Sequence, residues 1–435
     1  MQYLGERVKK TVGKKETIRQ EIADHSYSTD LLIPAASRMA KSAVASMDYV
    51  SQNYNYIHSI YAANNNVIDE TFILSLEELL AAKKYRAAIS KTQELIFDHR
   101  DARLPALGKQ LTGKLCTVLG IAYYHINDTI SIKYLNSAVE ILKDGDCYMY
   151  LSNTYNYLGL WKLREQKYKE MEYFIQEANS ILSNITLSNC HLKLDICYNL
   201  ALSFYLQHRL NEALDSVKTT LDHCSKYSIY CDHGRFKRLI SSIYKSMGRI
   251  EDAVGSCIKA VDFYKLTDDN FMVHQCYVDL SVLYRILKDH PHSEYYINQA
   301  IQYFESTHSS IPLANAFAEK IISMFVFNSS DILIEDMICT IIKEHYLDED
   351  VKGDLLSILA TIELRNKNYN KALELYKLSE EHIACNVMSE MDIYLYQGLS
   401  EIYDYYADTQ RSNLYCSKAN AVFEAKPYYE SLFNR

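Results

Sequence analysis

Glycine and proline are scarce in this chain, with 12 Gly and 5 Pro among 435 residues. Glycine-dependent turns are therefore few, which favours helices over a large β-fold and over glycine-rich phosphate-binding loops. No run of residues approaches the ~18–20 consecutive apolar side chains that span a membrane. Residues 1–16, MQYLGERVKKTVGKKE, contain no apolar stretch of signal-peptide length. We therefore expect a cytoplasmic protein that does not contact a membrane.

Sequence motifs of catalysis and metal binding are also missing. The chain has no GxxxxGK[ST], GxGxxG or HExxH motif and no CxxC pair. The nearest metal-like group, His223-Cys224 with Cys231-x-His233, has a spacing that fits no common zinc module. We expect no enzyme activity, no cofactor and no metal. An enzyme with an unrecognised site is an alternative, which a buried carboxylate or histidine of strongly shifted pKa in a cleft would favour.

Charge is unevenly distributed along the chain, and the cysteines are not arranged in pairs. The net charge is -9, but residues 1–60 carry 8 Lys and Arg against 6 Asp and Glu, while the remainder carries 38 against 49. The basic segment suits a polyanion and the acidic body does not. The 11 cysteines are scattered, and in a reducing cytoplasm we expect free thiols, several of them acting as small buried hydrophobes.

A motif recurs about every forty residues through most of the chain. It consists of a loop and a helix start, with a mostly small or aliphatic residue at one position: Ala88, Ile132, Met171, Ala213, Ala253, Ser293, Ala372 and Ser412. One interval is close to twice the others, so we expect a ninth, degenerate repeat near residue 333. A fixed period of this size predicts a stack of helical hairpins, each burying its apolar face on its neighbours.

A second small residue recurs in the helix before each loop. It is Gly120, Gly159, Ala201, Ser241, Ser281, Ala360 and Ser400. A larger side chain there would push the two helices of a hairpin apart. The combined pattern W/Y-x2-L-G/A-x2-Y-x8-A-x3-F/V-x2-A resembles the tetratricopeptide repeat over residues 70–425, with repeats nearer forty than the usual thirty-four residues. The resemblance implies an all-α, right-handed superhelix of about nine hairpins, which we assign to residues 63–435.

Polar residues near the core positions of the first helices are the candidate ligand-binding residues. In a repeat superhelix these helices form the concave face. The set is Asn153, Asn156, Asn199, Arg235, Arg238, Asp279, Arg285 and Gln397. Asparagine can bond both the N–H and C=O of an extended peptide, and arginine can grip a carboxylate with two bonds. As a set they predict a polar groove suited to a peptide, although each one alone could be an ordinary solvated side chain.

Residues 1–62 do not follow the forty-residue repeat and predict a separate domain of short helices. Thr17 and Gln20 fit a capping box, and further caps are expected at Ser28–Thr29 and Ser46. The order of elements resembles the Xre-type helix-turn-helix, with LGERVKK as its first helix and TIRQEIAD as its second. The resemblance implies DNA contacts from one helix laid in the major groove. The candidate contacts are Arg19, Gln20, Thr29, Ser37, Arg38 and Lys41. Pro34 departs from the pattern, because proline costs ~3 kcal/mol inside a helix.

A helix-turn-helix followed by such repeats resembles the RRNPP family, which includes Rap, Rgg, NprR, PlcR and PrgX. The resemblance implies a cytoplasmic quorum-sensing regulator that binds a short secreted signalling peptide in the groove. It also implies a homodimer on double-stranded DNA whose DNA binding the peptide changes. The alternative is a Rap-like regulator or scaffold, which uses the same repeats to bind a protein and does not bind DNA.

Overall fold

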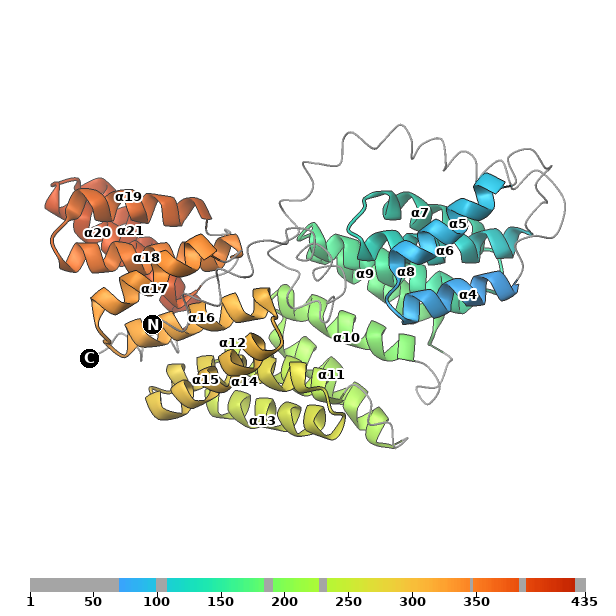
Figure 1. Ribbon diagram of the computed structural model, residues 1–435, viewed down its shortest axis with the longest axis horizontal. Helices are drawn as coiled ribbons and strands as arrows, with labels where there is room; N and C mark the ends of the chain where they lie inside the picture. The colour runs from blue at the N-terminus through green and yellow to red at the C-terminus, as the bar shows by residue number, and fades with distance from the viewer. Residues whose placement is uncertain are drawn as a thin grey trace. The chain divides into compact units, whose positions relative to one another are not determined.

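The computed structural model describes residues 70–98, 108–183, 191–226, 233–344, 347–382 and 389–426. Over these residues the chain is built from helices, and no strand occurs among them (Figure 1). The expected domain at residues 1–62 and its six candidate DNA contacts lie outside the described residues.

Eighteen helices are present in the described residues and pair in sequence order. The helices are α4 (Glu70–Ala81), α5 (Tyr85–Asp98), α6 (Lys109–His125), α7 (Ile130–Leu142), α8 (Tyr148–Arg164), α9 (Tyr168–Ile181), α10 (His191–Leu206), α11 (Leu210–Lys226), α12 (His233–Ser246), α13 (Ile250–Leu266), α14 (Asn270–Ile286), α15 (His290–Ser306), α16 (Ser310–Val326), α17 (Asp331–Glu344), α18 (Glu349–Arg365), α19 (Tyr369–His382), α20 (Glu390–Tyr405) and α21 (Thr409–Ala425). Each even-numbered helix and the odd-numbered helix that follows it form a hairpin. The degenerate ninth repeat expected near residue 333 is confirmed as the hairpin α16–α17.

The chain divides into two compact units, Met1–Ile229 and Tyr230–Arg435. The first unit contains the hairpins from α4–α5 to α10–α11, and the second contains those from α12–α13 to α20–α21. Within each unit, successive hairpins stack so that first helices contact first helices, as α6 does α8 and α18 does α20. This all-α stacking of hairpins confirms the expected fold class for the described residues.

Small residues allow the two helices of a hairpin to pack closely. A Cβ added to Gly159 would lie 2.6 Å from the Ile175 side chain of α9, a distance that real structures do not tolerate. In other hairpins a serine stands at the same position and its hydroxyl spans the contact, as where Ser241 Oγ donates to the carbonyl of Ala253 at 2.7 Å. The close approach inferred from the recurring small residues is therefore present.

The second loop motif in unit 1, expected around Ile132, is displaced by one residue from the expected register. The buried position of α7 is Ser131, whose side chain is fully buried, whereas Ile132 is only half-buried. The Ser131 hydroxyl donates to the carbonyl of Gly120 at 2.6 Å. The shift arises because α7 begins with a tight turn, in which Ile132 N–H bonds the carbonyl of Thr129 only three residues earlier.

The turns inside the hairpins explain how the chain manages with little glycine. Each of the nine contains one residue in the left-handed region, at the same place: Lys83, Asn127, Gln166, His208, Gly248, Lys288, Asn328, Lys367 and Ala407. The turn closes as a Schellman motif, in which Lys288 N–H bonds the carbonyl of Arg285 and Asp289 N–H bonds that of Tyr284. Only Gly248 is a glycine, so eight turns accept the strain of a left-handed side chain.

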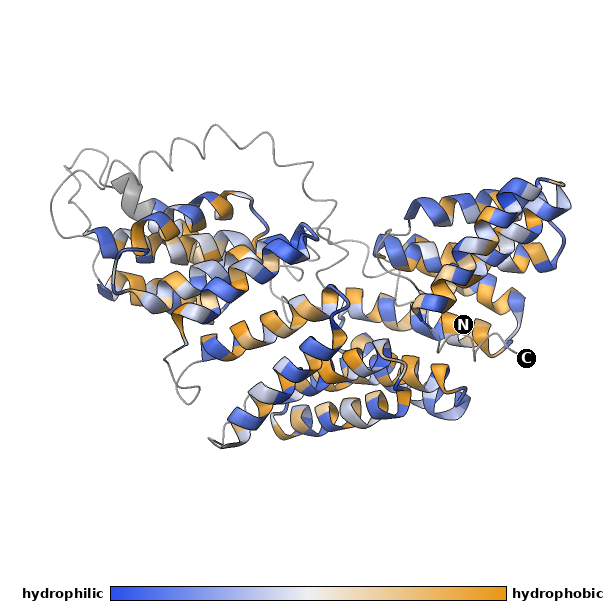
Figure 2. Cartoon of the chain, turned by 180° about the vertical axis from the view of Figure 1, so that it is seen from behind, coloured by the Kyte–Doolittle hydropathy of each residue, from blue (hydrophilic) through white to orange (hydrophobic). Residues whose placement is uncertain are grey.

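Apolar and polar residues alternate around the helices, as Figure 2 shows by colour. Apolar side chains form the contacts between helices, and Met171, Ile175 and Ala178 of α9 are fully buried. Among the described helices, none combines the length and the apolarity needed to cross a membrane. The cysteines of the described residues are free thiols. At repeat positions expected to be buried, Cys257 is buried, Cys197 is half-buried and Cys416 is exposed, so the expectation is wrong for Cys416.

Candidate functional site

All eight candidate ligand-binding residues lie on the first helices of their hairpins. Asn153 and Asn156 lie on α8, Asn199 on α10, Arg235 and Arg238 on α12, Asp279 and Arg285 on α14, and Gln397 on α20. The structure brings some of these residues together and separates others.

In unit 1, Asn156 on α8 and Asn199 on α10 form a hydrogen bond between neighbouring hairpins. Asn199 Nδ2 donates to Asn156 Oδ1 at 2.8 Å, and the two side chains are 4% and 2% exposed. The side-chain oxygen of Asn199 is buried without a hydrogen-bond partner. Such an atom ordinarily costs about 1–3 kcal/mol. The pair is therefore a polar contact between first helices that retains one unused acceptor.

In unit 2, Arg238 and Asp279 form the corresponding contact. Arg238 Nε donates to Asp279 Oδ2 at 2.6 Å and Arg238 Nη2 to Asp279 Oδ1 at 3.3 Å. Arg238 stands three residues before the small residue of its helix, as Asn156 does, and Asp279 stands two before, as Asn199 does. Polar bonds between neighbouring first helices thus recur at equivalent positions in both units.

Arg285 lies in a buried ion cluster that joins three first helices. Its Nε and Nη2 donate to the two carboxylate oxygens of Glu319 on α16 at 2.9 and 3.1 Å. Its Nη1 donates to Glu390 in the first turn of α20. Burial by itself lowers the pKa of Arg285, but the two carboxylates reverse this and raise it, so the guanidinium stays charged. This side chain binds the protein's own carboxylates, and the expected grip on a ligand carboxylate stays a prediction.

Two further carboxylates lie beside this cluster on α18 and α20. Burial raises the pKa of Asp354 to about 8, helped by the negative charge of Asp392. Burial likewise raises the pKa of Asp392 to about 6, against a bond from the Ser389 backbone N–H. Ser389 Oγ donates to Asp354 Oδ1 at 2.8 Å. Both carboxyl groups therefore hold a proton more readily than an exposed aspartate does, and Asp354 the more strongly of the two.

A carboxylate of raised pKa is also a feature of enzyme active sites, so the surroundings of the half-buried Asp354 matter. The hydroxyl of Ser389 beside it caps α20, accepting from the N–H groups of Met391 and Asp392 at 3.1 and 3.3 Å while donating to Asp354. Its proton and lone pairs are thus engaged in structure. A hydroxyl held in this way is not prepared for nucleophilic attack.

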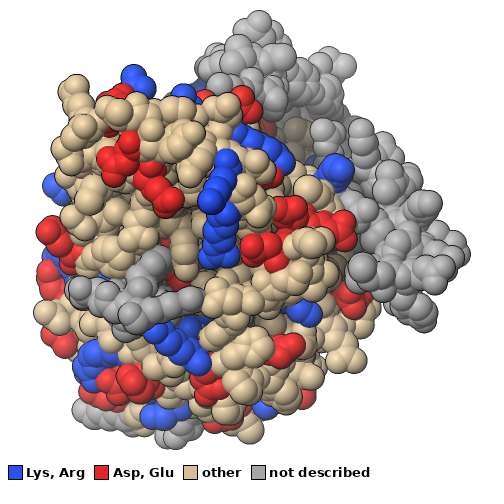
Figure 3. Space-filling view, turned by 90° about the vertical axis from the view of Figure 1, so that its left-hand side faces the viewer, with Lys and Arg blue, Asp and Glu red and all other residues tan. Residues whose placement is uncertain are grey.

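The remaining candidates differ in exposure. Asn153 and Arg235 are half-buried, and Gln397 is exposed on α20. Over the face drawn in Figure 3, acidic and basic side chains are interspersed. Whether these residues bind a ligand stays a prediction.

Four carboxylates of this site, Glu319, Asp354, Glu390 and Asp392, are not among the residues predicted from the sequence. Glu319 stands two residues before Ile321, the same position as Asp279 and Asn199. Ile321 replaces the small residue in the degenerate repeat, so the register there was not recognised. In the hairpins that contain the recurring small residue, it lies seven residues before the left-handed turn residue, as Gly159 does before Gln166. The same interval from Asn328 leads to Ile321, and this register places Glu319 at the position of Asp279.

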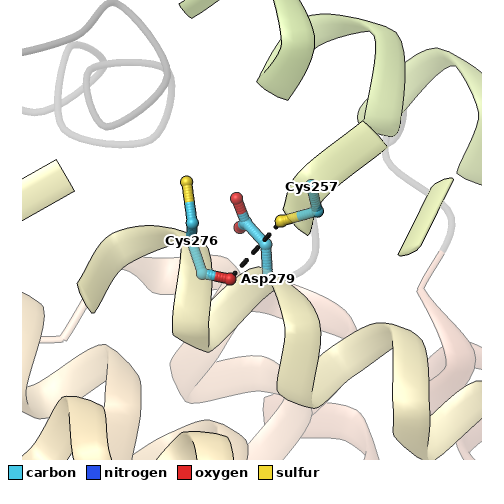
Figure 4. A group of neighbouring side chains, drawn as sticks. All are labelled: Cys257, Cys276 and Asp279. Carbon is cyan, nitrogen blue, oxygen red and sulfur yellow. Dashed lines mark hydrogen bonds between the residues drawn. The ribbon is translucent and has the colours of Figure 1, made fainter. Parts of the chain in front are cut away.

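One group of side chains has the composition of a metal site. Cys257 of α13 and Cys276 and Asp279 of α14 have ligand atoms within 4.8 Å of one another (Figure 4). Cys257 Sγ donates to the Cys276 carbonyl at 3.5 Å, and a bond with Cys276 and burial raise the pKa of the Cys257 thiol. Arg238 already neutralises Asp279, and Cys257 occupies the core position of Ile175 in α9. Packing explains these residues better than a metal does. Cys231, from the metal-like group in the sequence, lies outside the described residues.

Comparison with known proteins gives the fold and little sequence likeness. No family model matches the chain, and no curated protein does. Among solved structures it is similar to a Rap protein complexed with Competence and Sporulation Factor, with 13% identity, TM-score 0.55, and coverage of 82% of this chain and 98% of that one. It is similar to the apo quorum sensor NprR from B. thuringiensis, with 13% identity, TM-score 0.57 and coverage of 81% and 98%. It is also similar to NprR in complex with its cognate peptide NprX, with 11% identity, TM-score 0.51 and coverage of 73% and 96%. The expected resemblance to RRNPP proteins is confirmed at the level of the repeat fold.

Proposed function

We propose that this protein is a peptide-sensing regulator, in which a short signalling peptide binds along the first helices of the repeats. Peptide binding would change how residues 1–62 bind double-stranded DNA. The protein would act in the cytoplasm as a homodimer and would have no catalytic role. The similarity of the fold to NprR bound to its cognate peptide supports the proposal.

The observation that carries the proposal is that each unit has a polar contact between neighbouring first helices, buried in unit 1 and partly buried in unit 2. Asn156 with Asn199 and Arg238 with Asp279 place hydrogen-bonding groups at equivalent positions of successive hairpins. Hydrophobic side chains of similar size would satisfy packing alone, and in some proteins buried polar groups are retained because they confer specificity. The unused amide oxygen of Asn199 is suited to accept a peptide N–H.

Repeat stacks provide a physical route from binding to regulation. Each hairpin contacts only its neighbours, so small rotations at each contact add up along the stack. A peptide that binds one curvature better than another shifts the population toward it, by an amount set by the difference in affinity. Side chains that bridge several first helices, as Arg285 does, would differ most between two curvatures.

Substitution of the asparagine pair tests the peptide site. We expect Asn199→Ala to weaken binding of peptides selected from a random library about ten-fold, because a hydrogen bond to a buried amide contributes about 1 kcal/mol or more. Calorimetry would measure the affinity, and circular dichroism would confirm that the stack remains folded. Asn136→Ala, on the exposed side of α7, is the matched control. Equal affinities for the three proteins would place the peptide elsewhere.

Selection of DNA tests the regulatory half of the proposal. We expect the full chain to enrich a two-fold symmetric sequence from a random duplex library, and a chain lacking residues 1–62 to enrich none. Adding the peptide should change the enrichment. Light scattering of the full chain would check the homodimer.

A Rap-like regulator or scaffold without DNA binding is the second candidate, which the similarity to a Rap protein favours. In that case the full chain would enrich no DNA sequence but would still bind peptide. Cross-linking in cells would then recover a protein partner whose binding the peptide alters.

A further inference from the structure

One region of unit 2 contains more buried carboxylates than cations. Arg285 directs its N–H groups to Glu319 and Glu390. Asp354 on α18 lies close enough to Asp392 on α20 for the charge of Asp392 to raise the pKa of Asp354. Arg285 therefore bonds two of the four carboxylates, and neither Asp354 nor Asp392 is a partner in those bonds.

Two carboxylate oxygens in this region are buried without a hydrogen-bond partner. They are Glu390 Oε1 and Asp392 Oδ1, on side chains that are only 4% and 3% exposed. An unbonded buried oxygen of a charged group is costly, and folded proteins contain few such groups. Both oxygens can therefore accept a further hydrogen bond.

The start of α20 explains part of the arrangement but not all of it. Negative side chains are favoured in the first turn of a helix, and Asp392 Oδ2 accepts from the Ser389 backbone N–H at 2.8 Å in a capping box. These interactions use the other oxygen of Asp392 and leave Oδ1 unbonded. They also do not act on Asp354, which belongs to a different helix.

The spacing of the carboxylates favours a large organic cation over a single metal ion as their ligand. Among the described residues, the group of ligand atoms compact enough for one metal ion is Cys257, Cys276 and Asp279, and these carboxylates are not part of it. Oxygens spread over two helices suit a forked or elongated cation, whose N–H groups diverge. Asp354 is only half-buried, so a cation can approach from its side.

We propose that Asp354, Glu390 and Asp392 form a subsite for the positively charged side chain of a peptide ligand, arginine or lysine. This inference rests on the proposed peptide-binding function and adds the charge of one ligand residue to it. Without ligand, protons reduce the negative charge of the subsite, because the pKa of Asp354 is raised to about 8. An arriving cation lowers that pKa and displaces the proton into solvent.

Selection from a peptide library tests the subsite with the full chain. Random peptides of about five to eight residues are incubated with the protein, and those retained are sequenced by mass spectrometry. We expect arginine or lysine to be enriched at one position relative to the input. Asp354→Asn should weaken binding of the selected peptides about ten-fold or more, as expected for loss of a charge-assisted hydrogen bond. Glu374→Gln, an exposed carboxylate of α19 in the same unit, should bind like the unaltered protein.

The outcomes separate this inference from the proposed function. Retained peptides without a preferred basic residue would overturn the subsite and leave peptide binding intact. Retention of no peptide would overturn peptide binding and the subsite with it. A basic preference that Asp354→Asn and Glu390→Gln both preserve would move the subsite to other residues.

Proton release provides a second measurement that needs no variant. Calorimetric binding of a selected peptide is repeated at pH 7 in buffers of different ionisation enthalpy. We expect a net release of protons with the arginine peptide and almost none when norleucine replaces the arginine. Equal proton exchange for the two peptides would overturn the assignment of the cation to Asp354.

Discussion

Arg285 at the end of α14 bonds Glu390 at the start of α20, although 105 residues separate them in the chain. The contact links first helices of hairpins that are not neighbours in sequence, and Glu319 of α16 completes it. Both carboxylates and the guanidinium are almost fully buried. The cluster therefore fixes how these helices lie relative to one another within unit 2.

Removing the guanidinium should strongly destabilise unit 2. Arg285→Met leaves Glu319 and Glu390 buried without their cation, which typically costs about 3–5 kcal/mol. Urea unfolding followed by circular dichroism would measure the loss. Arg249→Met, which removes an exposed pair with Asp252, should cost less than about 1 kcal/mol. Similar losses for the two variants would contradict a structural role for the buried cluster.

Stability should fall as pH rises because of Asp354. Its pKa is raised to about 8 in the folded protein and is about 3.9 in an unfolded chain. Between these values the folded state holds a proton that the unfolded state has released, so its stabilising effect is complete below pH 4 and disappears as pH passes 8. Asp354→Asn should therefore flatten the decline between pH 5 and pH 9, by about 1–2 kcal/mol once solvent screening is allowed for. Parallel urea midpoints for the variant and the unaltered protein across this range would refute the prediction.

Substitutions at two left-handed turn residues should change stability in opposite directions. Ala407 has φ 58° and Gly248 has φ 75° at the same place in two hairpins of unit 2. Ala407→Gly should relieve strain and stabilise the protein by about 0.5–1 kcal/mol, after subtracting the greater freedom of glycine in the unfolded chain. Gly248→Ala should destabilise it by about 1 kcal/mol. Thermal unfolding would measure both, and shifts of the same sign would argue against turn strain as the cause.

Close packing predicts a different effect for two helical glycines. A Cβ at Gly398 would lie 2.0 Å from the hydroxyl of the buried Tyr376, whereas nothing lies within 4 Å of a Cβ at Gly255. Gly398→Ala should cost about 1–3 kcal/mol through overpacking. Gly255→Ala on the exposed side of α13 should instead stabilise the helix by up to about 1 kcal/mol. Chemical denaturation would compare them, and a gain for Gly398→Ala would mean that Tyr376 moves aside freely.

The helical hairpins and their number could be predicted from the sequence, since the evidence for them is local. Small residues such as Gly159 and Ser241 recur with the period of the repeat, and each acts on the helix that follows it within about twelve residues. The degenerate hairpin α16–α17 is predicted only by the double interval between Ser293 and Ala372. Its buried residue Glu319 was not found, since Ile321 hides the register there.

The sequence by itself determined that successive segments form amphipathic helices and pair as hairpins, because periodicity and tight turns act over a few residues. Only the tertiary structure decided which polar side chains meet. Asn156 reaches Asn199 across one repeat and Arg285 reaches Glu390 across three. Such contacts depend on how hairpins stack, and that geometry is the sum of many small packing angles that no single stretch of residues encodes. The pKa of Asp354 is likewise raised by Asp392 only because the stacking brings α18 and α20 together.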